Sequence, residues 1–260
     1  MTTNISMPYP EVNSRWRFDW VLPVLFRPRK AFAEIAAATT SVSFTPIFLL
    51  VLSALVRTLV MGSIKEAAAT SGQIQLPPGF EYFTPEQQAQ FYQAASATSG
   101  PVFVYLLPAI MVIIGVLLGW LILSGLLHLV LTMFGGRGSS QQALNIIAWS
   151  LLPFVLRDVV RIIAMWTSNQ LIGNPGLSGF APTEEGMLNL YLAGLLRNID
   201  LYLLWFIWLT GVGLSQSSQL RSGKTWFAVL LTLIIIQLIR AVPPLIAAQF
   251  SDLTVIRPFF

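Results

Sequence analysis

The sequence predicts an all-α, polytopic membrane protein: a bundle of five transmembrane helices with short amphipathic interfacial helices. Composition is the first observation, because 55% of the 260 residues are hydrophobic, only 10% are charged and the mean hydropathy is +0.71. A soluble domain carries about 25% charged residues. The second observation is that the apolar residues form unbroken runs near the roughly 20 residues that cross a bilayer. Helices are expected because backbone polar groups in lipid must be paired within the chain.

Five apolar runs define the expected spans. The first follows Thr45-Pro46, where proline is tolerated in the first turn of a helix. The second is longer than the hydrocarbon thickness and must tilt or protrude, and the fifth is bent or ended by Pro243-Pro244. The expected spans are residues 45–64, 101–134, 144–166, 201–214 and 226–250.

The spans divide the chain into a cytoplasmic N-terminal segment (1–42), a membrane domain (43–250) and a C-terminal tail (251–260). Residues 28–37 predict a short helix with Phe32 and Ile35 on one face. This helix either lies along the inner membrane surface or packs on its own bundle. Between the first two spans, Thr84-Pro85-Glu86-Gln87 matches a capping box and predicts a helix to about Ser96.

The distribution of basic residues predicts the orientation of the chain. If the N-terminus is cytoplasmic, eight basic residues fall inside and three outside. The inner set is Arg15, Arg17, Arg27, Arg29, Lys30, Arg137, Arg221 and Lys224, and the outer set is Lys65, Arg197 and Arg257. We therefore expect a multi-pass protein of the cell membrane with a cytoplasmic N-terminus and an extracytoplasmic C-terminus.

Several short motifs lie at the inner ends of the spans. They are Phe26-Arg27-Pro28-Arg29-Lys30-Ala31-Phe32, Leu127-His128, Gly135-Gly136-Arg137-Gly138-Ser139, Ala143-Leu144, Ala148-Trp149-Ser150-Leu151-Leu152-Pro153, Gly213-Leu214 and Leu220-Arg221-Ser222-Gly223-Lys224. In this order and spacing, over about residues 20–250, the sequence resembles the prokaryotic branch of the Yip1 domain family. The aspartate- and tyrosine-rich signature that eukaryotic members carry, tied there to Rab GTPases, is absent. The resemblance implies a five-helix membrane protein without catalytic residues. It also implies an accessory role, since some bacterial members resemble companions of ABC-type exporters.

The glycine-rich loop after the second span has two interpretations. Its glycines permit a tight reversal between two helices, and Ser139 or Ser140 can cap the next helix. Alternatively, the backbone amides of Gly135, Gly136, Arg137, Gly138 and Ser139 bind an anion or a lipid headgroup. The loop lacks the spacing and the Lys-Ser/Thr pair of a nucleotide-binding P-loop.

Six charged residues fall in or near the spans, where a charge costs about 2.5–3.5 kcal/mol or more. They are Arg57, Arg157, Asp158, Arg161, Asp200 and Arg240, with a net charge of +2. Counting at about 1.5 Å per residue from the inner end puts them from the midplane outward, on different helices.

Helical spacing allows two local ion pairs, Asp158 with Arg161 and Arg197 with Asp200. Arg57, Arg157 and Arg240 have no partner within their own helix. One interpretation is an interhelical network in which the two aspartates are shared among the arginines and fix the packing. The other is an outward-open cavity that attracts an anion, such as a lipid phosphate.

The composition excludes several functions. The chain has no cysteine and a single histidine, so neither a catalytic group nor a metal or other cofactor site is expected. The few, scattered cations indicate neither nucleic acid nor nucleotide. The leading hypothesis is a non-catalytic accessory subunit that binds membrane lipids and another membrane protein, such as an ABC-type exporter, or a second copy. The alternative is an anion- or headgroup-binding transporter or channel. Gly115 and Gly119 further predict a close helix contact, within the chain or in a dimer.

Overall fold

A computed structural model describes residues 16–70, 80–98, 100–182 and 186–246. Every regular element in these ranges is a helix or a helical turn, which confirms the all-α class. The elements are η1 (Phe18–Trp20), α1 (Val21–Phe26), α2 (Pro28–Ala37), α3 (Phe44–Thr70), η2 (Phe80–Tyr82), α4 (Pro85–Thr98), the π-helical turn η3 (Val102–Leu106), α5 (Leu107–Met133), α6 (Ser140–Ser150), α7 (Leu152–Ser168), η4 (Ser178–Phe180), α8 (Met187–Leu196), α9 (Leu201–Ser217) and α10 (Ser222–Arg240).

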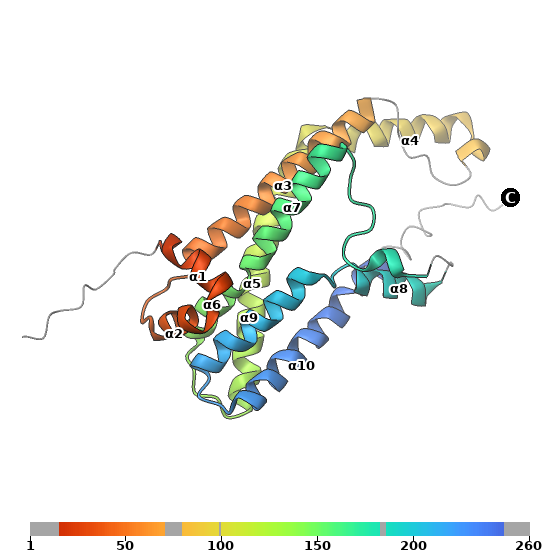
Figure 1. The fold of residues 1–260 in the computed structure, drawn as a ribbon. Coiled ribbons are helices and arrows are strands. Elements are labelled where there is room, and N and C mark those ends of the chain that lie inside the picture. The colour runs from red at the N-terminus through yellow and green to blue at the C-terminus, as the bar shows by residue number, and fades with distance from the viewer. Residues whose placement is uncertain (1–15, 71–79, 99, 183–185, 247–260) are drawn as a thin grey trace, which may run out of the picture.

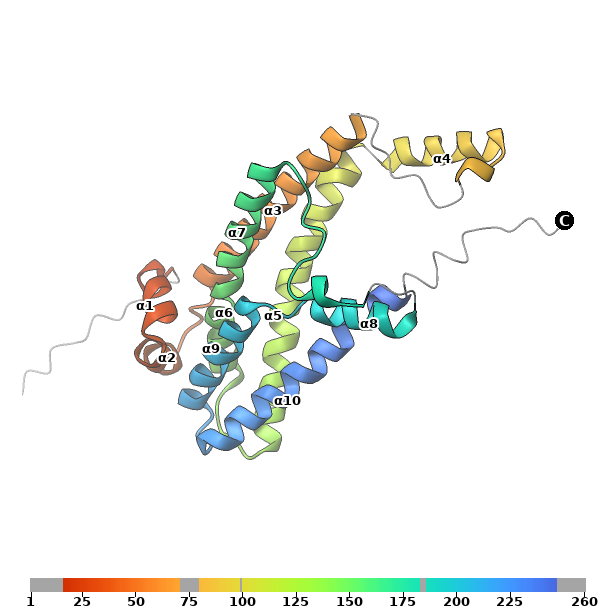
Figure 2. The same ribbon diagram turned by 45° about the vertical axis from the view of Figure 1, so that its right-hand side comes forward.

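The chain runs back and forth between two ends of the bundle (Figure 1). Helices α1 and α2 lie at one end and α4 at the other, and the second view shows the same separation (Figure 2). Helix α4 begins with the predicted capping box: the Thr84 amide donates to Gln87 Oε1 at 2.9 Å, and the Gln87 amide donates to Thr84 Oγ1 at 3.3 Å. The proposed boundary between the membrane domain and the C-terminal tail, at residues 250 and 251, lies outside the described ranges.

The predicted count of five spans is not confirmed. Three helical segments of the described ranges are long and apolar enough to cross a membrane: Phe44–Ala68, Val102–Met133 and Ser222–Ile246. A fourth span results if α8 and α9, which are bent by 62° relative to each other, count as one. Taken alone, α9 has 17 residues and is about 26 Å long, shorter than the roughly 30 Å hydrocarbon core.

The third predicted span, 144–166, is divided into α6 and α7 at Leu151. Pro153 at the start of α7 lacks the N–H that would continue the hydrogen-bond ladder. Helix α7 has 17 residues, about 26 Å, and carries the three charges of Arg157, Asp158 and Arg161, so it is not among the segments long and apolar enough to cross a membrane. The third predicted span is therefore not confirmed as one continuous helix.

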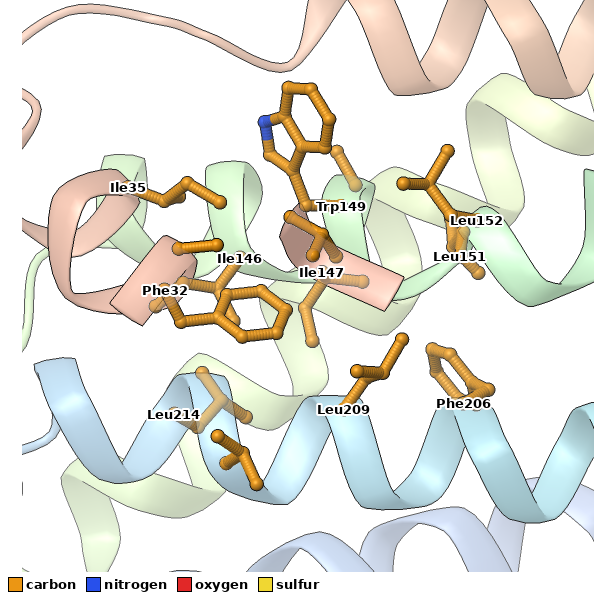
Figure 3. Close-up of a cluster of buried hydrophobic side chains, with 14 of the residues drawn as sticks. Phe32, Ile35, Ile146, Ile147, Trp149, Leu151, Leu152, Phe206, Leu209 and Leu214 are labelled. Carbon is orange, nitrogen blue, oxygen red and sulfur yellow. The ribbon is translucent and has the colours of Figure 1, made fainter. Parts of the chain in front are cut away.

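A cluster of buried hydrophobic side chains joins α2, α6 and α9 (Figure 3). Phe32 and Ile35 on α2 are fully buried, and they face Ile146 on α6 and Leu209 and Leu214 on α9. Of the two alternatives for residues 28–37, the structure shows a helix packed on its own bundle. The N-terminal segment therefore shares one hydrophobic core with the membrane domain.

Trp149 links the segment between α2 and α3 to this core through a hydrogen bond and a ring contact. Its indole Nε1 donates to the Val42 carbonyl at 2.9 Å, and its ring packs edge-on against Trp20 at 5.8 Å. One helix turn earlier, Asn145 Oδ1 accepts from the Val42 amide at 3.1 Å. Both bonds satisfy buried backbone groups that have no helical partner.

The exposed apolar side chains at this end belong to α1 and to the segment before it, residues 16–20, rather than to α2. Phe18, Leu22 and Phe26 are exposed at four-residue spacing. Trp16 stacks on Phe18 at 5.9 Å and meets Phe48 of α3 edge-on at 5.4 Å. The exposed apolar face of α3 therefore continues onto η1 and α1.

Replacing Gly213 in α9 by alanine should destabilise the protein. The added methyl would lie 2.5 Å from Ile146 Cγ2 and 2.9 Å from Phe32 Cδ1, in the core just described. We expect a loss of about 1–3 kcal/mol from overpacking, although alanine favours a helix over glycine by about 1 kcal/mol. The matched control is Gly125→Ala in α5, where an added Cβ meets nothing within 4 Å. Thermal unfolding in detergent, followed by circular dichroism, should lower the midpoint only for Gly213→Ala; equal midpoints would contradict the assignment.

Candidate functional site: an arginine-lined cavity in the bundle

The six charged residues of the spans come from three helices and the N-cap of a fourth. Arg57 lies on α3, Arg157, Asp158 and Arg161 on α7, and Arg240 at the end of α10, while Asp200 is the N-cap of α9. The structure brings five of the six into two interhelical ion-pair groups.

Asp158 joins α7 to α3. It is only 3% exposed, its Oδ1 lies 3.3 Å from Arg57 Nε, and its Oδ2 accepts from the Ser53 hydroxyl at 3.5 Å. Because a buried carboxylate without a counter-charge is strongly disfavoured, this pair favours the contact of the two helices.

Asp200 joins α7 to α9. Its Oδ2 lies 3.5 Å from Arg157 Nη1 and 3.6 Å from Arg161 Nη2. Its Oδ1 accepts from the Leu203 amide at 2.9 Å, which caps α9 and places a negative charge at the helix N-terminus. One carboxylate therefore neutralises two arginines and starts a helix.

The two ion pairs predicted within single segments do not form among the described residues: neither Asp158–Arg161 nor Arg197–Asp200 is within 4 Å. Arg157 and Arg161, four residues apart, share the face of α7 that meets Asp200, whereas Asp158 points to α3. Arg197 and Asp200 lie on no common helix, because α8 ends at Leu196 and α9 begins at Leu201. Asp200 is shared between two arginines, whereas Asp158 has an ion pair with Arg57 alone among the described residues.

Arg240 has no carboxylate within 4 Å among the described residues, and the Arg157 charge repels it. The guanidinium groups of Arg57, Arg157 and Arg240 also donate no hydrogen bond of good geometry to the described protein groups. An arginine has five N–H donors. The six residues, four positive and two negative, retain a net charge of +2.

A cavity of about 800 Å³ lies among α3, α5, α7, α9 and α10. Its charged lining residues are Arg57, Lys65, Arg157, Asp158 and Arg240. Its volume is in the range of about 300–1,000 Å³ that is typical of ligand sites. Arg161 and Asp200 are outside the lining and support it through Arg157.

The comparison with known families matches a single domain across most of the chain. The Yip1 domain model covers residues 22–242. The chain belongs to the Yip1 domain family. No curated protein and no solved structure matches it. Family membership and the long apolar helices together make it a membrane protein.

In this Yip1 domain protein, the glycine-rich loop forms a tight turn. Gly135 has φ +90°, and the amides of Gly135, Gly136 and Arg137 donate to the carbonyls of Thr132, Leu131 and Ser218. Gly138 approaches α9 so closely that an added Cβ would lie 2.8 Å from the Ser217 carbonyl oxygen. Of the two predicted capping residues, Ser139 is the N-cap of α6, and it forms a capping box with Gln142. Since these amides are already used, the contacts favour the turn over an anion site.

Four polar lining residues were not predicted from the sequence: Thr58, Lys65, Asn198 and Gln237. Lys65 lies eight residues after Arg57, and therefore on the same face of α3, but the predicted span ended before it. Gln237 lies three residues before Arg240 and donates to the Asn198 carbonyl at 3.5 Å. A helical-wheel comparison with the arginines identifies Lys65 and Gln237; Asn198 lies in the bend between α8 and α9 and has no such signal.

Asp158→Asn should destabilise the Yip1 domain fold by about 3 kcal/mol, because it leaves the Arg57 charge without its partner. The control is Asp19→Asn, which breaks the exposed Arg17–Asp19 pair at 2.8 Å and should lower stability by less than about 1 kcal/mol. Thermal unfolding in the same detergent compares the two variants. Equal effects would show that the α3–α7 ion pair does not stabilise the bundle.

Proposed function

We propose that this protein binds a phosphate-bearing anion in the arginine-lined cavity, as a non-catalytic membrane protein that carries or senses that anion. The observation that carries the proposal is the convergence of Arg57, Arg157 and Arg240 on one cavity with a surplus of positive charge. Uncompensated charges in a membrane segment are costly, so a negatively charged ligand would stabilise the net positive charge of this cluster.

The chemistry of the lining favours phosphate. Guanidinium groups match phosphate oxygens through paired, charge-assisted hydrogen bonds. Arg57 and Arg157 each have a buried Nε without a hydrogen-bond partner, and Arg240 has no ion pair among the described residues. Asp158 and Asp200 are each held in ion pairs with arginines.

The proposed orientation puts the cavity's arginines toward the extracytoplasmic side. Arg29, Lys30, Arg137, Arg221 and Lys224 belong to the end of the bundle that holds α2 and the turn between α5 and α6. Positive residues concentrate on the cytoplasmic side of membrane proteins. With the N-terminus cytoplasmic and the C-terminus outside, Arg57, Arg157 and Arg240 lie nearer the outer leaflet of the cell membrane.

Arg240→Gln provides the cleanest test, because Arg240 stabilises no ion pair among the described residues. We expect the variant to bind dioleoyl phosphatidylglycerol about tenfold more weakly, because it loses a charged hydrogen-bond donor. Its lipid-free thermal stability should rise, because the variant carries no desolvated charge at this position and the repulsion with Arg157 is removed. Native mass spectrometry of the full chain in mild detergent gives the lipid affinity, and differential scanning calorimetry gives the thermal stability of the lipid-free protein.

The control for this experiment is Arg197→Gln, which removes an arginine outside the cavity lining. It should bind phosphatidylglycerol as the wild type does. The wild type should also prefer phosphatidylglycerol to dioleoyl phosphatidylcholine. Equal binding of the two lipids, or unchanged binding by Arg240→Gln, contradicts the proposal.

A second role, as an accessory subunit of another membrane protein such as an ABC-type exporter, is supported by helix α5. The segment Val102–Met133 contains an 18-residue apolar stretch, and no residue of that stretch is buried in the described structure. Purification from native membranes in mild detergent should recover a stoichiometric second membrane protein or a homodimer. Leu121→Trp, on the exposed surface of α5, should reduce that recovery, and Ile234→Trp, equally outside the cavity on α10, should not. A lone wild-type chain contradicts this role.

A further inference from the structure

The cavity is polar at one end and apolar at the other. Arg57 and Lys65 lie on the outer part of α3, and Leu50 and Ala54 line its inner part. Helix α7 repeats the gradient, from Arg157 and Asp158 at the outer side to Leu151 at the inner side, and α10 repeats it from Arg240 to Leu233. Three helices therefore give the cavity the same polarity along its length.

A phosphate group fills only part of this space. The lining on α3 extends from Leu50 to Lys65, about 22 Å of helix. A phosphate has five heavy atoms and, at about 30 Å³ for each water-sized atom, occupies about 150 Å³ of the 800 Å³. The remainder is lined mainly by aliphatic and aromatic side chains of α5, α9 and α10, which are poor partners for water.

Helix α5 supplies a shallow, open wall on the apolar side. Gly115 and Gly119 line the cavity, and a Cβ added at either position meets nothing within 4 Å. The helix–helix contact that this glycine spacing predicted is therefore not formed among the described residues. Met111 and Ile122 also line the cavity and are 58% and 59% exposed, so this wall is open to the surroundings of the bundle.

We infer that the occupant is an anionic glycerophospholipid, with its phosphate at Arg57, Arg157 and Arg240 and one acyl chain along α5 across Gly115 and Gly119. The inference rests on the proposed anion site and adds the apolar half of the ligand. The polarity of the cavity matches the two halves of an amphiphile, and its positive surplus matches an anionic headgroup. The open wall at α5 gives the acyl chain of the lipid a lateral path from the bilayer, and a free phosphate does not need such a path.

The test fills the apolar half and leaves the arginines in place. In the full chain, Gly115→Leu with Gly119→Leu should reduce the affinity for dioleoyl phosphatidylglycerol by about tenfold or more, because leucine side chains occupy the path of the acyl chain. The matched control is Gly125→Leu, on the same helix with equal free space but outside the cavity lining. Met111→Trp narrows the same wall from an exposed position and provides a second variant if the double variant does not fold.

A probe without acyl chains distinguishes a lipid-binding site from a site for a free anion. Glycerol 3-phosphate carries a phosphate and glycerol without acyl chains, and in a hundredfold excess it should displace little phosphatidylglycerol from the wild type. Full displacement at equal concentration, or wild-type lipid affinity in both filled variants, overturns the lipid assignment. These outcomes leave the anion site intact as long as Arg240→Gln still weakens binding. Unchanged binding in Arg240→Gln removes both.

Discussion

The arrangement of the helices depends on the balance of charge inside the membrane segments. Two aspartates pair with three of the four arginines across helices: Asp158 of α7 pairs with Arg57 of α3, and Asp200 at the start of α9 pairs with two arginines of α7. Moving any of these helices apart exposes a charge to a medium where it costs several kcal/mol. The same balance leaves a surplus of positive charge, and that surplus lines the cavity. Stability and the candidate function therefore have one origin.

The opposite end of the bundle is held by apolar packing. Helix α2 inserts Phe32 and Ile35 between α6 and α9, and Trp149 binds the connection to α3 through its indole N–H. This base leaves α5 and α10 in contact near Phe134 and Phe227. Farther along, both helices line the cavity, from Ile122 on α5 and from Leu233 on α10. The chain thus has an end held by apolar packing and a cavity toward the other end, because apolar and charged residues are segregated along the same helices.

Much of the fold could be predicted from local sequence rules, and the failures have physical causes. The capping boxes at Thr84 and Ser139, the tight turn at Gly135 and the family were predictable, because each depends on short spacing. The five-span count was not confirmed. The third apolar run is divided in two before Pro153, and its second half carries three charges. The arginines were found by their rarity. Their partners were not, because the choice of Asp158 for Arg57 is a long-range contact that helical spacing cannot encode.

Asp200 links the local order of one helix to the wall of the cavity. Its two oxygens belong to a single rigid, planar group: Oδ1 holds the first turn of α9, and Oδ2 holds Arg157 and Arg161. Turning that plane shifts both contacts together, so the bend before α9 and the position of the Arg157 guanidinium are mechanically coupled. A displacement of one by even a fraction of an ångström is transmitted to the other through the carboxyl carbon.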